Sequence, residues 1–207
     1  KMKIVVLAAG TSTEREVSIV SGTEVCKALR SRGHQAILVD VFFGKEGADP
    51  ATAFDGDYDV DVEATYISSF NAQVKDAVAS GREFFGPGVI KLCKAADVVF
   101  MALHGANGED GRVQAYFDLC GIPYTGTGYL SSAMAMDKGI TKKIFRTSGV
   151  PTPRGVELKK GKDSMNLADY NMELPVVVKT CCGGSSVGVY ITKTPEEYEE
   201  ALKGAFS

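Results

Sequence analysis

Lys3-Ile4-Val5-Val6-Leu7-Ala8-Ala9-Gly10, an apolar and largely β-branched run, predicts a buried strand that ends at a glycine. Thr13, with Glu16 three residues later, predicts a capping box for a helix that Gly33 ends. Residues 34–41 then predict a second strand. Strand, loop, helix and strand in this order are the unit of a parallel, doubly wound α/β sheet.

The same unit recurs later in the chain. Residues 97–103 predict a buried strand, residues 104–111 a polar, glycine-rich loop, and residues 113–119 a helix. In open parallel sheets, ligands bind outside the carboxyl ends of the strands. The loops 11–16 and 104–111 both belong at that edge, so we expect the substrate site there.

The remaining segments are less regular. Residues 44–63 predict a surface excursion rich in aspartate, and residues 66–79 a helix. A basic helix opens at Asp137-Lys138 and ends before Pro151. Short strands are expected at 153–158, 174–180 and 187–193, followed by a helix that starts at Thr194-Pro195-Glu196-Glu197. We place a domain boundary near Met136, giving domains 1–136 and 137–207.

Residues 176–189 join two β-branched runs through a glycine- and serine-rich loop, with Lys179 at the end of the first run. Backbone amides and hydroxyls at such a tip, backed by one cation, form a place to hold phosphate oxygens. The alternative is a plain hairpin whose glycines permit positive φ and whose lysine is solvated.

Composition excludes several classes of protein. The 207 residues are 44% hydrophobic and 24% charged, as in globular domains, and the net charge of −3 gives no basic field for nucleic acid. No apolar run approaches the ~20 residues needed to cross a bilayer. Five cysteines with no C-x-x-C spacing, and only two histidines, predict reduced thiols, a cytoplasmic setting and no structural zinc.

Four segments carry more specific information: Ala8-Ala9-Gly10-Thr11-Ser12-Thr13-Glu14-Arg15-Glu16-Val17-Ser18, His104-Gly105-Ala106-Asn107-Gly108-Glu109-Asp110-Gly111, Met136-Asp137-Lys138, and the loop that follows Lys179. In this order they resemble the D-alanine:D-alanine ligase family of ATP-grasp enzymes. The resemblance implies a Rossmann-like pre-ATP-grasp N-terminal domain that binds substrate, followed by the first part of an ATP-grasp domain.

The resemblance also implies a reaction. ATP with Mg²⁺ (or Mn²⁺) phosphorylates the carboxylate of one D-alanine, and the amine of a second D-alanine attacks the D-alanyl phosphate, giving a dipeptide for peptidoglycan precursor synthesis. Members of the family are longer than this chain, and their metal ligands lie beyond residue 207. We therefore expect an N-terminal portion that is inactive alone, from a protein that is a homodimer at full length.

Roles for individual residues follow from the resemblance. Glu14 positions the amino group of the first D-alanine. The alternative is that Glu14 has no substrate role and is an acidic residue favoured by the dipole at a helix N-terminus. Ser18 and His104 are expected to contact substrate, although a histidine that only binds a backbone carbonyl is an equal alternative. Ser185 links the phosphate loop to the substrate site, so Glu14 and Ser185 are the expected catalytic residues. The expected ATP-binding residues are Lys138, Lys179, Ser185, Ser186 and Val187.

Other charged residues receive structural interpretations. Glu109 and Asp110 are expected to support the first turn of the next helix, and Lys142 and Lys143 to lie on a solvated helix face. Two positions depart from the family pattern: Ala9 where glycine is usual, and Thr180 where proline is usual. These departures leave the local backbone geometry open.

Three alternatives stay open. A ligase making D-alanyl-D-lactate or D-alanyl-D-serine would share these residues. A nucleotide-linked oxidoreductase would share the opening unit, with Asp40 as its ribose-binding acid, but residues 10–15 do not provide the required G-x-G-x-x-G. A non-catalytic nucleotide-binding module would have no folding reason to keep Glu14, Lys138, Lys179 and Ser185 together.

Overall fold

The computed structural model describes residues 1–183 and 188–207. The chain divides into two compact units, a first unit of Lys1–Ala133 and a second unit of Met134–Ser207. Among the residues described, no helix has both the length and the apolar character needed to span a bilayer.

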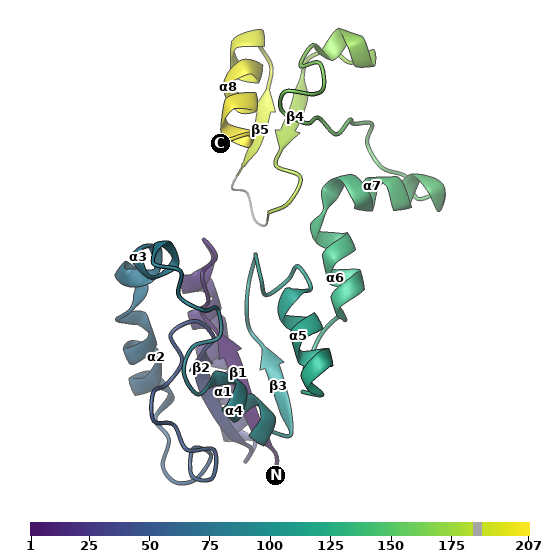
Figure 1. Cartoon of the computed structure of the whole chain (residues 1–207). Helices are drawn as coiled ribbons and strands as arrows, with labels where there is room; N and C mark the ends of the chain where they lie inside the picture. Colours follow the sequence, from purple (N-terminus) through teal and green to yellow (C-terminus); the bar gives the residue numbers. More distant parts are fainter. Residues whose placement is uncertain (184–187) are drawn as a thin grey trace. The chain divides into compact units, whose positions relative to one another are not determined.

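A three-stranded parallel sheet forms the centre of the first unit (Figure 1). Its strands are β1 (Lys3–Ala8), β2 (Gln35–Asp40) and β3 (Val98–Met101), in the order β2-β1-β3. Val5 of β1 is in register with Ile37 on one side and Val99 on the other. The predicted parallel α/β class is confirmed.

Helices cover both faces of this sheet. Those of the first unit are α1 (Arg15–Ser31), α2 (Val60–Ser68), α3 (Val74–Ala79), α4 (Val89–Ala95) and α5 (Arg112–Cys120), with a short 3₁₀ helix, η1 (Asn71–Gln73). The helix α6 (Tyr129–Met136) crosses the division between the units.

Alternate residues of β1 enter two different cores, as its period of two requires. Val5 and Leu7 pack with buried residues of α4 and α5, whereas Ile4 and Val6 pack with those of α1 and α2. Each fully buried side chain of this size stabilises the fold by about 1.5 to 3 kcal/mol. Burial on both faces explains why β1 is apolar throughout.

The second unit is built around an antiparallel hairpin. It contains α7 (Lys138–Thr147), a 3₁₀ helix η2 (Leu167–Tyr170), the strands β4 (Val176–Lys179) and β5 (Val189–Thr192), and α8 (Pro195–Ala205). The predicted start of α8 is confirmed, because Thr194 and Glu197 form a capping box and Pro195 is the first helical residue.

Three predictions about local structure were wrong. No capping box opens α1: it begins at Arg15 after Glu14, whose side chain makes no capping bond. The helix expected at 66–79 is broken: α2 starts earlier, with Asp59 as its cap, and ends at Ser68, and η1 and α3 follow. Between α2 and η1, Phe70 stacks on Phe43 at 4.7 Å. Residues 153–158 form no strand within the described chain, and the Gly155 carbonyl accepts a bond from Arg146 instead.

The region between β2 and β3 is less exposed than expected. Phe54 lies in the core at 2% exposure, although it belongs to the predicted surface excursion. The helix α4 was missed because it has no side-chain cap; it begins after Gly88, whose φ is +77°. Gly and Pro before it predict only a turn.

Candidate active site

Two loops meet at the carboxyl edge of the parallel sheet. One follows β1 (residues 9–14) and the other follows β3 (residues 104–111), and these strands are direct neighbours. The Ser12 hydroxyl joins the loops by donating a hydrogen bond of 2.7 Å to the His104 carbonyl. This is the edge at which doubly wound sheets bind their ligands.

Glu14 lies in the first loop, half-buried, with its backbone N–H donating to Ser12 Oγ at 3.1 Å. Its carboxylate has no hydrogen-bond or ion-pair partner among the residues that the structure describes. A methyl group on Gly105 would lie 2.8 Å from Glu14 Oε2, so the absence of a side chain at Gly105 is what leaves room for the carboxylate. The result is a half-buried anion able to accept bonds from an ammonium group.

His104 is also half-buried, and its Nε2 lies 3.2 Å from Ser21 Oγ. This bond orients the ring toward α1, the helix that contains Ser21. Glu109 and Asp110 accept bonds from backbone N–H groups of Gly105, Asn107 and Arg112, so they shape the loop. Asp110 thus reaches the first residue of α5, as expected, whereas Glu109 accepts its bond from Gly105, within the loop.

Ser18 is fully buried. Its hydroxyl accepts a bond from the Ala9 N–H at 2.8 Å and donates one to the Ala102 carbonyl at 2.8 Å. Both bonds tie the end of β1 to the end of β3. Ala9 itself has a φ of +68°, a left-handed conformation that alanine rarely adopts and that strained functional loops often contain.

A buried ion pair, Arg15 with Asp40, was missed as part of the site. Arg15 Nη2 lies 2.6 Å from Asp40 Oδ2, and both side chains are at most 6% exposed. Arg15 also donates to the Gly10 carbonyl and to Asn71 Oδ1, at 2.8 and 2.7 Å. The pair therefore holds the loop that carries Glu14. The available signal was a charged residue, Asp40, directly after the four apolar residues 36–39 of β2.

In the second unit, the start of α7 lies beside the loop that follows β4. The Lys138 N–H donates to the Cys181 carbonyl at 3.0 Å, and Lys138 Nζ donates to the Gly183 carbonyl at 2.7 Å. Lys179 ends β4 and is exposed. The structure thus brings Lys138 to the predicted phosphate loop, while Ser185, Ser186 and Val187 lie outside the described residues.

Lys142 joins this cationic group, which the sequence interpretation missed. It is partly buried, and its pKa is lowered by desolvation and then by the nearby charges of Arg146 and Lys179. Neither Lys142 nor Lys179 has a carboxylate partner in the described chain. Adjacent cations without counter-charges are stabilised by a polyanion such as a nucleotide phosphate. Lys143, by contrast, is exposed and pairs with Glu157, as a solvated face predicts.

Comparison with known proteins identifies the family. A model described as "D-ala D-ala ligase N-terminus" matches residues 3–127, more than half of the chain. The chain belongs to the D-Ala-D-Ala ligase family. A second model of the same family, "D-ala D-ala ligase C-terminus", matches residues 144–207. The resemblance inferred from the four sequence segments is confirmed, and family membership excludes the oxidoreductase.

Individual members of the ligase family support this. The D-alanine--D-alanine ligase of Lacticaseibacillus casei (strain BL23) is 41% identical over 210 residues, covering 99% of this chain and 58% of that enzyme. The D-alanine--D-alanine ligase of Bacillus anthracis, solved complexed with ATP, matches with a TM-score of 0.68 and 29% identity, covering 100% of this chain and 55% of its own. The VanG D-Ala:D-Ser ligase of Enterococcus faecalis matches with a TM-score of 0.68 and 27% identity, covering 99% and 59%.

The chain therefore spans just over half the length of the ligases it matches. In the family context, Asp40 is not a free ribose-binding acid, because its Oδ2 is held by Arg15 and its Oδ1 accepts the N–H groups of Phe42 and Phe43. Its role is to fix the loop that carries Glu14.

Proposed function

We propose that the full protein joins two D-alanines into D-alanyl-D-alanine at the expense of ATP, for peptidoglycan precursors. The observation that carries the proposal is the Glu14 carboxylate, half-buried without a partner in the described chain, in a loop that the family model covers. The domains are proposed as 1–136 for substrate and 137–207 as the start of the nucleotide-binding domain.

Glu14 accepts hydrogen bonds from the ammonium of the first D-alanine and so fixes the direction of its carboxylate. His104, held through Ser21, lies in the neighbouring loop and lines the same edge. Ser18 acts as a positioning residue, because its hydroxyl is fully used in joining β1 to β3.

Lys138, Lys179 and Lys142 offset the charge of the ATP phosphates, with Ser185, Ser186 and Val187 completing the loop. The proposal draws support from the Bacillus anthracis ligase, which was solved complexed with ATP. Transfer of the γ-phosphoryl group to the D-alanine carboxylate gives a D-alanyl phosphate. The second amine then forms the C–N bond, loses a proton and expels phosphate.

Magnesium is the metal expected from the family, and when bound it neutralises phosphate charge. In the described chain, the only group of three neighbouring ligand side chains is Asp137, Cys181 and Cys182. Two soft thiols do not suit Mg²⁺, which prefers oxygen ligands. The described residues therefore do not fit this ion, and we assign it no step.

The first experiment is a coupled ADP-release assay on a protein extended to the length of its relatives, beside the 207-residue chain. Turnover with D-alanine alone, seen only in the long form, is expected. Turnover that needs D-serine or D-lactate would replace the proposed second substrate, and silence in both would favour a non-catalytic nucleotide-binding module. Dipeptide formation by the 207-residue chain would overturn the expectation that it is inactive alone.

Glu14→Gln is the sharpest variant. It keeps the shape of the side chain but removes its charge, so kcat/KM for D-alanine should fall by about 10- to 100-fold, the loss of one charge-assisted bond. Glu16→Gln is the matched control, since Glu16 is exposed in the first turn of α1, the helix that follows Glu14. Equal losses in both variants would contradict the role of Glu14.

Lys142→Met tests the nucleotide site in the same way. Removal of this partly buried cation should weaken ATP binding by about tenfold, whereas Lys143→Met should not change it, because Lys143 already pairs with Glu157. The measurement is ATP affinity by calorimetry. Sedimentation of the extended protein tests the proposed homodimer.

A further inference from the structure

Asp137, Cys181 and Cys182 gather at one point of the second unit, although the chain separates the aspartate from Cys181 by 44 residues. Backbone contacts bring the two segments together. Asp137 and Cys182 form an antiparallel β-bridge, and the Lys138 N–H donates to the Cys181 carbonyl at 3.0 Å. The group is therefore held by the main chain.

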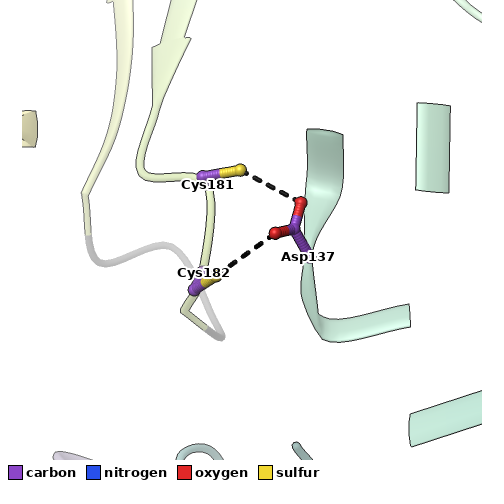
Figure 2. A group of neighbouring side chains, drawn as sticks. All are labelled: Asp137, Cys181 and Cys182. Carbon is purple, nitrogen blue, oxygen red and sulfur yellow. Dashed lines mark hydrogen bonds between the residues drawn. The ribbon is translucent and has the colours of Figure 1, made fainter. Parts of the chain in front are cut away.

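Both sulfur atoms point at the same carboxylate (Figure 2). Cys181 Sγ lies 3.2 Å from Asp137 Oδ1, and Cys182 Sγ lies 3.9 Å from Asp137 Oδ2. In a tetrahedral zinc site, Zn–S and Zn–O bonds near 2.3 and 2.1 Å place sulfur and oxygen about 3.6 Å apart. The two observed distances run to different oxygens of the carboxylate, so the side chains must rotate before one oxygen faces both sulfurs. The ligand atoms of the three residues already lie within 4.8 Å of one another.

The carboxylate is already fixed in place. Asp137 Oδ1 accepts the Ile140 N–H at 2.9 Å as the N-cap of α7. The two thiols are accessible, since Cys182 is exposed and Cys181 is half-buried. An ion would therefore find the Asp137 carboxylate already fixed and the two thiols accessible from solvent.

Chemistry selects the kind of ion. The carboxylate is a hard ligand, but the two thiolates are soft and favour Zn²⁺ over Mg²⁺ or Ca²⁺. Lys143 lies close enough for its pKa to be raised, first by Glu157 and then also by Asp137 and Cys181. Its charge and that of Lys138 offset the excess negative charge of a site with three anionic ligands.

We propose that Asp137, Cys181 and Cys182 bind one zinc-class divalent cation, with the fourth tetrahedral position open to water. Each bound ion would tie residues 181–182 to the start of α7, beside Lys138 and Lys179. Occupancy would therefore oppose nucleotide binding at that loop. The proposal of an ion site does not depend on the proposed ligase activity, whereas the proposed effect on nucleotide binding does.

The test is a Co²⁺ titration of the reduced, tag-free chain, followed by sulfur-to-cobalt charge-transfer absorption, with Zn²⁺ as competitor. One ion per chain is expected, with thiolate bands that Zn²⁺ removes and Mg²⁺ does not. Cys181→Ser and Cys182→Ser should each weaken binding by about 100-fold, one ligand's share of a zinc site. Asp137→Asn should weaken it by about tenfold while keeping the helix cap, since asparagine caps equally well.

Cys120→Ser is the matched control, because Cys120 is a half-buried free thiol of the first unit. Its variant should bind Co²⁺ as the parent does, and circular dichroism should show every variant folded. Three results would overturn the proposal: no thiolate bands, bands that survive in both cysteine variants, or one ion shared by two chains. A separate titration with ATP, where Zn²⁺ weakens binding in the parent and not in Cys182→Ser, tests the effect on nucleotide.

Discussion

The two units of this chain are stabilised differently. In the first, apolar side chains are buried on both faces of the sheet, in two continuous cores. In the second, Ala201 is the one apolar residue that is buried within the described chain. Val177 and Ile191 are paired across the hairpin yet are 52% and 71% exposed. Burial therefore holds the first unit, whereas caps and hairpin pairing define the second.

The candidate site residues of the two units differ in the same way, in the contacts that hold them. Glu14 belongs to a loop held by a buried ion pair and a buried serine. Lys138 begins α7 and Lys179 ends β4, and Lys138 donates to the Cys181 and Gly183 carbonyls near the surface. Buried groups therefore fix the loop that carries Glu14, whereas the contacts of Lys138 lie near the surface.

The largest expected effect concerns the ion pairs. Arg15→Met leaves the Asp40 charge buried and unpaired, so the free energy of unfolding should fall by about 3 to 5 kcal/mol. Glu157→Gln breaks the exposed pair with Lys143, and the free energy of unfolding should not change by more than the experimental error. Urea unfolding followed by circular dichroism measures both. Equal effects would mean that the two units are not held differently.

A matched pair of isoleucines comes next. Ile67 is 1% exposed and Ile191 is 71% exposed, so the same truncation to alanine tests burial directly. Ile67→Ala should cost about 2 to 5 kcal/mol because it opens a cavity, and Ile191→Ala less than about 0.5 kcal/mol. A large loss at Ile191 would show that this face of the hairpin is covered in solution.

Helix caps should give a smaller effect, and here the loss of stability is expected in the second unit and not in the first. Thr194→Ala removes the capping box of α8 and should destabilise the second unit by about 1 kcal/mol. Thr13→Ala should have no effect, because α1 has no side-chain cap. Hydrogen exchange of the backbone amides measures the stability of α8 and of α1 separately. Loss of protection in α1 of the Thr13→Ala variant would show that Thr13 does cap this helix.

The last effect, thiol titration, is absent near neutral pH. Burial raises the pKa of Cys26 and of Cys93 to about 12. Because the folded pKa is raised, this contribution to stability is complete below about pH 8.5 and is lost as pH rises toward 12. Replacing both cysteines by alanine should therefore reduce the fall in stability with rising pH. At pH 8, a thiol reagent should modify Cys182 in the folded chain, and Cys26 and Cys93 only after unfolding.

Elements with a strong local pattern were predicted well. The strands of the first sheet, the start of α8 and the start of α7 at Asp137-Lys138 all follow from residues close together in the chain. Elements that depend on distant contacts were not. The helix α4 begins at a glycine without a cap, and Phe54 enters the core from a polar segment, because burial against the sheet outweighs local composition.

The candidate site divides similarly. Motifs alone pointed to Glu14, His104, Lys138 and Lys179 and to the ligase family. Folding was needed to show that Arg15 pairs with Asp40, that Gly105 makes room for Glu14, and that Asp137 meets two cysteines. Sequence alone determines which groups a segment carries and which turns and caps it forms, because these depend on neighbouring residues. Which groups are buried, paired or left free depends on segments far apart in the chain, so only the tertiary structure decided that.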